Sequence, residues 1–250
     1  LSSSLYSNRI RAVVRELSTN AYDAHVAVNK ESEPFLVHLP NRLEHWFSVR
    51  DYGPGLSKDD VENLYTTYGE SIKTNSNSYI GALGLGSKSP FAYTDTFSIT
   101  SFFNGVKYSY SMYMDSSNCP SLVLLGEEET NEHNGLEVSV SVKSYDAERF
   151  INEAKFVYST FKVKPTIVGS SITFSNEEVL VSGSCWELLR NSGELTFIMG
   201  QVQYSASGLS NSLSSSHRYL LEKNIRIHLS VGEADINPSR ESLSYDNQTV

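Results

Sequence analysis

Asp51 opens a short segment that could hold a flat ligand. The pattern Asp51-x-Gly53-x-Gly55 places a carboxylate, which accepts hydrogen bonds, just before two residues that have no Cβ atom. Backbone without Cβ atoms can approach a planar ring closely, so the segment favours a ligand with a ring and a hydrogen-bond donor. The alternative is that Asp-Tyr-Gly-Pro-Gly forms a tight turn and binds nothing.

A second glycine-rich segment could bind phosphate groups. Gly81-x2-Gly84-x-Gly86 precedes a predicted short helix, and N–H groups at a helix N-terminus can bind phosphate. A P-loop would need Lys directly after the last glycine, but Ser87 separates Gly86 from Lys88. The dinucleotide-binding fingerprint also fails, because its glycines come in another order and follow a strand. Neither common phosphate-binding motif therefore describes this segment.

Three polar residues fall on one stripe of a predicted helix. Glu16, Asn20 and Asp23 lie within about 60° of one another on a helical wheel, beside the apolar stripe. A polar stripe that borders the buried side should line a cleft at the edge of the core. The alternative is an ordinary solvated helix face.

The hydrophobic pattern predicts the elements that would position these segments. A helix is expected from Ser4 to about Ala27, with Ser3 or Ser4 as its N-cap. Residues 69–78 are polar and lack periodicity, so we expect them to be mobile. Further strands are predicted over 33–39, 45–50, 96–103, 106–114, 121–125 and 136–142, and further helices over 57–68 and 146–161.

Composition and charge exclude several classes of protein. The chain has 250 residues, 39% of them hydrophobic, and no uncharged apolar run approaches the roughly 18 residues of a membrane span. Its 20 Lys and Arg against 29 Asp and Glu give a net charge of −9, so we expect no direct nucleic-acid binding. Cys119 and Cys185 are the only cysteines, which leaves a disulfide scaffold or zinc ribbon unsupported. Since the chain begins at Leu1, we expect an internal fragment.

Taken in chain order, the three segments resemble the nucleotide-binding signature of the GHKL ATPases. These include gyrase B, MutL-type repair proteins, heat-shock ATPase chaperones and histidine kinases. Residues 8–17, 84–91, 93–101 and 238–244 look most like the RIIA-type rapid-lysis proteins of tailed bacteriophages. The resemblance covers most of the chain.

The resemblance implies an α+β Bergerat fold, in which helices cover an antiparallel or mixed sheet and ATP lies between the layers. It places a GHKL ATP-binding domain at residues 1–143, with a lid at about 56–90, and a transducer-like domain at 144–250. Strand patterning returns after Pro165, which agrees with a boundary near residue 144.

The resemblance also implies a role for each polar residue. Glu16 would be the general base for the attacking water, and Asn20 would bind Mg²⁺ through its amide oxygen. Asp51 would accept a hydrogen bond from the adenine amino group, and Arg240 would bring its guanidinium to the γ-phosphate from the second domain. The implied ATP-binding residues are Asn20, Asp23, Asp51, Gly53, Gly55, Lys73, Gly81, Gly84, Gly86, Ser87 and Lys88.

Some of these assignments have alternatives. Lys88 could equally be an exposed residue at the start of a helix, and Arg240 could form a salt bridge between the domains. Many GHKL proteins have Gly-Thr where this chain has Gly135-Leu136, so adenine would be held without a threonine hydroxyl.

Three hypotheses about function follow from the resemblance. The first is a Mg²⁺-dependent, slowly hydrolysing ATPase of the phage RIIA type, an ATP-gated dimeric clamp that acts in host lysis timing or host-defence evasion. The second is a nucleotide-sensing scaffold with little or no turnover. The third is the ATPase portion of a gyrase-like or MutL-like DNA machine.

The first hypothesis also implies the cofactors, the oligomeric state, the partner and the location of the protein. ATP and Mg²⁺ would be its cofactors, and the full-length protein would be a homodimer. A host or phage protein, not identifiable from the sequence, would be its partner. It would lie in the host cytoplasm or peripherally at the inner membrane, without a membrane span.

Overall fold

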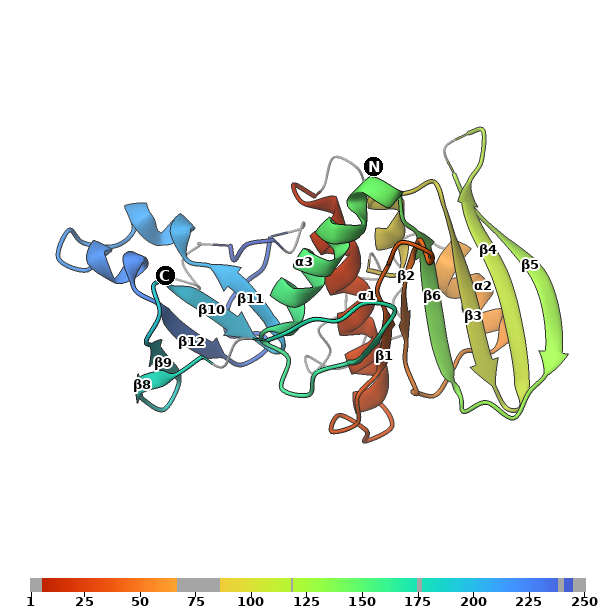
Figure 1. The fold of residues 1–250 in the computed structure, drawn as a ribbon, viewed down its shortest axis with the longest axis horizontal. Coiled ribbons are helices and arrows are strands. Elements are labelled where there is room, and N and C mark those ends of the chain that lie inside the picture. The colour runs from red at the N-terminus through yellow and green to blue at the C-terminus, as the bar shows by residue number, and fades with distance from the viewer. Residues whose placement is uncertain (1–5, 67–85, 118, 175–176, 238–240, 245–250) are drawn as a thin grey trace.

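The described residues form two packed units (Figure 1). The computed structural model describes residues 6–66, 86–117, 119–174, 177–237 and 241–244. The first unit is a seven-stranded sheet covered by helices, and the second is built on a five-stranded sheet. In Figure 1 the helices α1 and α3 lie between the two sheets. These two helices therefore separate the seven-stranded sheet from the five-stranded sheet.

Helix α1 (Arg9–Val26) carries the polar stripe predicted from the sequence. Its N-cap is Asn8, whose side chain accepts a hydrogen bond from the backbone N–H of Arg11 at 3.1 Å. The expected start at Ser4 is therefore wrong, and Ser3 and Ser4 lie outside the described residues. The helix begins later because the Asn8 side chain satisfies an N–H group that has no partner within the helix.

The seven strands of the first unit follow the order β5-β4-β3-β6-β2-β1-β7. All neighbours are antiparallel except β1 and β7, which are parallel. Alternation sets the faces of β3, where Phe97 and Ile99 are buried and Ser98 is exposed. The strands are β1 (Leu36–His38), β2 (Trp46–Arg50), β3 (Thr96–Phe103), β4 (Val106–Met114), β5 (Pro120–Glu129), β6 (Gly135–Ser141) and β7 (Thr166–Val168).

The helices of the first unit place an apolar face on this sheet. Phe150 and Tyr158 of α3 are fully buried, and the Tyr158 hydroxyl lies 2.9 Å from that of Ser18 on α1. The short helix predicted after Gly86 is a 3-10 helix that contains Pro90, which has no backbone N–H to donate. Besides α1 the helices are α2 (Lys58–Thr66), η2 (Gly86–Ala92), η3 (Ser144–Asp146) and α3 (Ala147–Tyr158).

The second unit has its own small core beside the sheet of order β11-β10-β12-β9-β8. Met199, Val202, Tyr204, Ala234 and Leu243 form this core. The elements are β8 (Val179–Ser182), β9 (Trp186–Leu189), β10 (Thr196–Met199), β11 (Val202–Ser205), η4 (Ser207–Asn211), η5 (Arg218–Glu222) and β12 (Ile225–Leu229).

The hydrophobic packing divides the chain later than residue 144. Helix α3 contributes Phe150, Ala154 and Val157 to the first core, and Phe161 belongs to it as well. Strand β7 pairs with β1 through residues 166–168. A break in packing therefore falls after β7, because the segment that follows β6 covers and extends the first sheet before the chain enters the second unit.

Candidate functional site

Asp51 lies at the end of β2 and is buried. Its Oδ1 accepts hydrogen bonds from the backbone N–H groups of Gly53, at 2.9 Å, and Leu136, at 3.2 Å. No described residue donates a hydrogen bond to its Oδ2. Burial raises the pKa of Asp51, and the two backbone hydrogen bonds partly offset that rise. The carboxylate is thus fixed through one oxygen, and the other can accept from a ligand.

The backbone N–H of Leu136 donates a hydrogen bond to Asp51, and this contact needs no side-chain hydroxyl group. The side chain at this position is apolar, whereas its N–H donates to Asp51. Leucine at this position therefore allows the carboxylate to be anchored, because the contact comes from the backbone.

Arg50 holds the backbone of the same segment from the other side. Its guanidinium donates to the carbonyl oxygen of Asp51 and to that of His133, the latter at 2.7 Å. It also lies over the ring of Phe102, 3.9 Å from the ring centroid. Burial lowers the pKa of Arg50, and the charge of Asp51 opposes that shift. The sequence pattern did not indicate this contact.

His25 joins the last turn of α1 to the Asp51 segment. Its Nε2 lies 2.9 Å from the backbone N–H nitrogen of Tyr52 and must accept that hydrogen. Its Nδ1 lies 3.1 Å from the carbonyl oxygen of Glu33 and must donate to it. These two partners fix a neutral imidazole with its proton on Nδ1. His25 is a supporting residue that the sequence pattern did not single out.

The glycines after Asp51 are required by packing within the protein. A Cβ at Gly53 would lie 2.7 Å from the Cβ of Ala24 on α1, which is too close. Gly55 has a φ of +72°, and a Cβ there would overlap the carbonyl oxygen of Phe102. The structure shows that these two positions need glycine because the backbone lies close to α1 and β3. That they also allow a ligand ring to approach the backbone stays a prediction.

Gly135 is the glycine whose substitution we expect to be most damaging. It has a φ of +145°, and a Cβ there would overlap the carbonyl oxygen of Asp51. Gly135→Ala should lower the free energy of unfolding by at least about 2 kcal/mol, because backbone strain and overpacking add. Thermal or urea unfolding measures this effect.

Gly126→Ala is the matched control, because no described atom lies within 4 Å of a Cβ built there. We expect its unfolding midpoint to stay close to that of the wild type. Equal destabilisation by the two substitutions would contradict the assignment of Gly135 as a required close contact.

The polar stripe of α1 meets the start of η2. Glu16 and Asp23 are each 1% exposed, so the alternative of a solvated helix face is wrong. A Cβ at Gly86 would lie 2.9 Å from Oε2 of Glu16 and 3.4 Å from Nδ2 of Asn20. The absence of a side chain at Gly86 therefore lets the backbone of η2 come against the carboxylate and the amide.

Ser87 and Lys88, which come directly after Gly86, are buried. Both are 7% exposed, so Lys88 is not an exposed residue at a helix start, and that alternative is wrong. Burial lowers the pKa of Lys88. Ser89 is also buried, and its hydroxyl has no hydrogen-bond partner among the described residues. Polar groups are thus concentrated in the first turn of η2.

The other predicted residues lie outside the described part of the chain. They are Lys73, Gly81, Gly84 and Arg240, and most of the expected lid at 56–90 lies outside it too. Within the described ranges, no helix is long and apolar enough to cross a membrane. No group of three or more His, Cys, Asp or Glu side chains in those ranges is arranged to hold a metal ion.

Comparison with known proteins bears on the fold. No family model matches the sequence, and no curated protein matches it. The ATPase region of Saccharomyces cerevisiae topoisomerase II is 14% identical, with a TM-score of 0.58 over 92% of this chain and 76% of that one. The same region bound to ICRF-187 (dexrazoxane) is 14% identical, with a TM-score of 0.60 over 93% and 77%. This chain has the GHKL ATPase fold.

The GHKL fold confirms the predicted α+β class, with helices on a mixed sheet. At 14% identity the likeness concerns the fold alone. The roles assigned to Glu16, Asn20, Asp51 and Arg240 stay predictions, and so does the resemblance to the RIIA-type proteins.

Proposed function

We propose that this chain binds Mg²⁺ and ATP between the Asp51 segment and the polar stripe of α1. The observation that carries the proposal is the Asp51 carboxylate, whose Oδ1 is held by two backbone N–H groups while no described residue donates to its Oδ2. A buried acceptor of this kind suits the amino group of adenine. The GHKL fold of the chain supports the same ligand.

The residues around Gly86 fit the phosphate end of the nucleotide. A Cβ at Gly86 would crowd Glu16 and Asn20, so only backbone borders these side chains there. Asn20 would hold Mg²⁺ through its amide oxygen, and Lys88 would face the phosphates. Bound Mg²⁺ would supply charge neutralisation on the phosphate oxygens.

Glu16 is the group that we assign to hydrolysis. Its carboxylate would take a proton from a water whose oxygen bonds to the γ-phosphorus, while the bond between that phosphorus and the bridging oxygen breaks and ADP keeps the electron pair. Arg15 donates to Oε1 of Glu16 through Nε, at 3.1 Å, and Nη2, at 3.0 Å. The carboxylate is thereby held in one orientation.

Calorimetric titration tests the proposal. ATP and a non-hydrolysable analogue should bind saturably to the wild-type chain, and omission of Mg²⁺ should weaken binding. Adenosine alone serves as the control for the base contact, because it lacks the phosphates whose charge Mg²⁺ would neutralise. An absence of binding at about millimolar ATP would overturn the proposal. A dissociation constant of about 1 mM corresponds to a binding free energy of roughly −4 kcal/mol.

The ion pair between Arg15 and Glu16 favours a second candidate function, a nucleotide-sensing scaffold with little turnover. This ion pair is buried, so the Glu16 carboxylate already has a partner within the protein. A scaffold would bind ATP as described and release little phosphate. A phosphate-release assay on the wild type and on Glu16 variants separates the two candidates.

The biological setting is proposed from the sequence resemblance alone. The segments at 8–17, 84–91 and 93–101 suggest a phage RIIA-type clamp, a homodimer at full length, that acts with a host or phage protein in lysis timing or defence evasion. A DNA machine is the remaining alternative, and the net charge of −9 disfavours DNA binding by this portion.

A further inference from the structure

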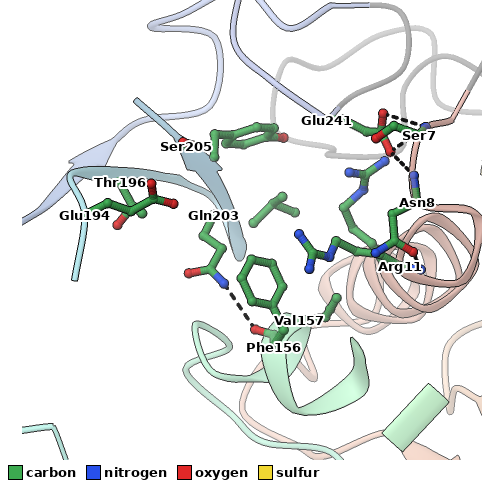
Figure 2. Close-up of a pocket in the computed structure, with 13 residues that line it drawn as sticks. Ser7, Asn8, Arg11, Phe156, Val157, Glu194, Thr196, Gln203, Ser205 and Glu241 are labelled. Atoms are coloured by element: carbon green, nitrogen blue, oxygen red, sulfur yellow. Dashed lines mark hydrogen bonds between the residues drawn. The ribbon is translucent and has the colours of Figure 1, made fainter. Parts of the chain in front are cut away.

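Helix α1 makes different contacts at its two ends. At its start, a cavity of about 390 Å³ lies between the two units (Figure 2). There Arg11 forms an ion pair with Glu153, with 2.6 Å between Nε and the carboxylate oxygen. Glu241, which Figure 2 shows beside Asn8, accepts a hydrogen bond from the Asn8 backbone N–H at 3.0 Å. In the last turn of the helix the contact is made by His25, and it reaches the proposed nucleotide site.

His25 and Arg50 bind the two polar groups of one peptide unit, the unit that joins Asp51 to Tyr52. The N–H of this unit donates to Nε2 of His25, at 2.9 Å. Its carbonyl oxygen accepts from the guanidinium of Arg50. Both side chains are buried. Because a peptide unit is planar and includes the Cα atoms on either side, bonds at both of its polar groups fix the Cα of Asp51 and the direction of its carboxylate.

The other ring nitrogen of His25 fixes the imidazole itself. Nδ1 donates to the carbonyl oxygen of Glu33, at 3.1 Å. Since the two partners are of opposite kinds, Nε2 faces Tyr52 as an acceptor. The preceding residue of the helix, Ala24, lies against Gly53. The last turn of α1 therefore supports this segment with two consecutive side chains.

The same helix carries the residues that we assign to the phosphate end of the nucleotide. Glu16 and His25 both belong to α1, and at a rise of about 1.5 Å per residue their Cα atoms lie roughly 14 Å apart along its axis. Asn20 lies between them. A single helix therefore sets the position of the base-binding carboxylate relative to the phosphate end, provided that its last turn stays bonded to the Asp51 segment.

We infer that His25 is a positioning residue for recognition of the base. By accepting the Tyr52 N–H, it holds the Asp51 carboxylate where that carboxylate can meet the amino group of adenine. The inference rests on the proposed binding of ATP. It makes Nε2 the decisive atom of His25, because Nδ1 contacts a carbonyl oxygen away from the segment. A purely structural histidine would stabilise the fold without affecting the choice of base.

Two substitutions separate the two ring nitrogens. Glutamine has its amide oxygen as many bonds from Cα as Nε2, so His25→Gln can still accept the Tyr52 N–H. Asparagine has its amide group where Nδ1 lies, so His25→Asn can keep the contact to Glu33 but loses the contact to Tyr52. In calorimetric titration, His25→Asn should bind ATP about tenfold more weakly than the wild type, whereas His25→Gln should stay within about threefold.

Comparison of ATP with ITP separates positioning from a general loss of structure. ITP has a carbonyl oxygen where ATP has its amino group, so it donates nothing to Asp51 from that position. His25→Asn should therefore weaken ITP binding less than about threefold and lower the preference for ATP. Equal losses for the two nucleotides, or unchanged ATP affinity, would overturn the inference. So would a tenfold loss of ATP affinity in His25→Gln, which decides the matter alone if His25→Asn does not fold.

Arg11→Gln is the matched control, because it breaks a contact at the opposite end of the same helix (Figure 2). It should leave the affinities for ATP and ITP within about twofold of the wild type, since distant sites act independently. A selective loss of ATP affinity in Arg11→Gln would contradict the assignment, because the effect would then come from α1 as a whole.

A further measurement needs no nucleotide. Hydrogen exchange of the Tyr52 N–H in the ligand-free protein should be about tenfold faster in His25→Asn than in the wild type, and close to the wild type in His25→Gln. Unchanged exchange in His25→Asn would overturn the inference even if ATP binds. Failure of the wild type to bind ATP would instead overturn the proposed function and leave the exchange result intact, so the two failures can be told apart.

Discussion

Asp51→Asn is expected to weaken ATP binding by about 100-fold and to leave the protein folded. Asparagine can keep its oxygen at the position of Oδ1, where the N–H groups of Gly53 and Leu136 donate. Its NH₂ then replaces Oδ2 and presents donors to the adenine amino group, which is itself a donor. A lost hydrogen bond to a charged acceptor, with two donors left facing each other, accounts for about 2.7 kcal/mol.

Calorimetry with ATP and ITP makes this test specific. Hypoxanthine has a carbonyl oxygen where adenine has its amino group, so the asparagine side chain of the variant can donate to it. The ratio of ITP to ATP affinity should therefore rise in the variant. An unchanged ATP affinity, or equal losses for both nucleotides, would contradict the assignment of Asp51 to the base.

The stability of the same variant provides the control for folding. Because burial raises the pKa of Asp51, its ionisation destabilises the fold as the pH rises through that pKa. The neutral amide removes this penalty, so we expect the unfolding midpoint at neutral pH to be equal to or above that of the wild type. A large fall in the midpoint would mean that lost binding reflects misfolding.

Glu16→Gln is expected to reduce ATP turnover by about 10²–10⁴-fold and to leave ATP affinity within about threefold. Glutamine keeps an oxygen that can accept from Arg15, but it cannot take a proton at neutral pH. Single-turnover phosphate release measures the chemical step, and calorimetry measures binding. Glu16→Asp, which keeps the charge but withdraws the carboxylate by one methylene, should also lose turnover.

Glu153→Gln is the matched control for Glu16. Glu153 also pairs with an arginine of α1, through a contact of 2.6 Å to Nε of Arg11, but it has no assigned role at Gly86. Its substitution should leave turnover unchanged. Wild-type turnover in Glu16→Gln would exclude Glu16 as the base, and an inactive wild type that binds ATP would favour the nucleotide-sensing scaffold.

Local patterning predicted two strands of the first sheet closely, whereas β5 extends from 120 to 129 beyond the predicted 121–125. The predicted ranges 96–103 and 106–114 coincide with β3 and β4. Alternation of apolar and polar residues is a local property, so it can be read directly from the sequence. The predicted start of α1 was wrong, because Asn8 and the distant Glu241 together satisfy N–H groups at the beginning of the helix.

Some residues of the candidate site could be predicted from the sequence, and others could not. The sequence singled out Glu16, Asn20 and Asp51, since a polar stripe and a strand end can be recognised locally. It did not indicate Arg50, nor the tautomer of His25. Those depend on carbonyl oxygens that only the folded chain brings within reach.

The sequence by itself indicated helices, strands and the residue types of the candidate site, because periodicity and glycine spacing are properties of neighbouring residues. The fold class came from the resemblance of its motifs to those of the GHKL ATPases. The tertiary structure decided the rest. It placed β7 beside β1, buried Lys88, and required Gly53 to be glycine by packing it on Ala24. It also brought Glu241 to the start of α1. Each of these contacts joins segments far apart in the chain, and only packing and burial select between such pairings.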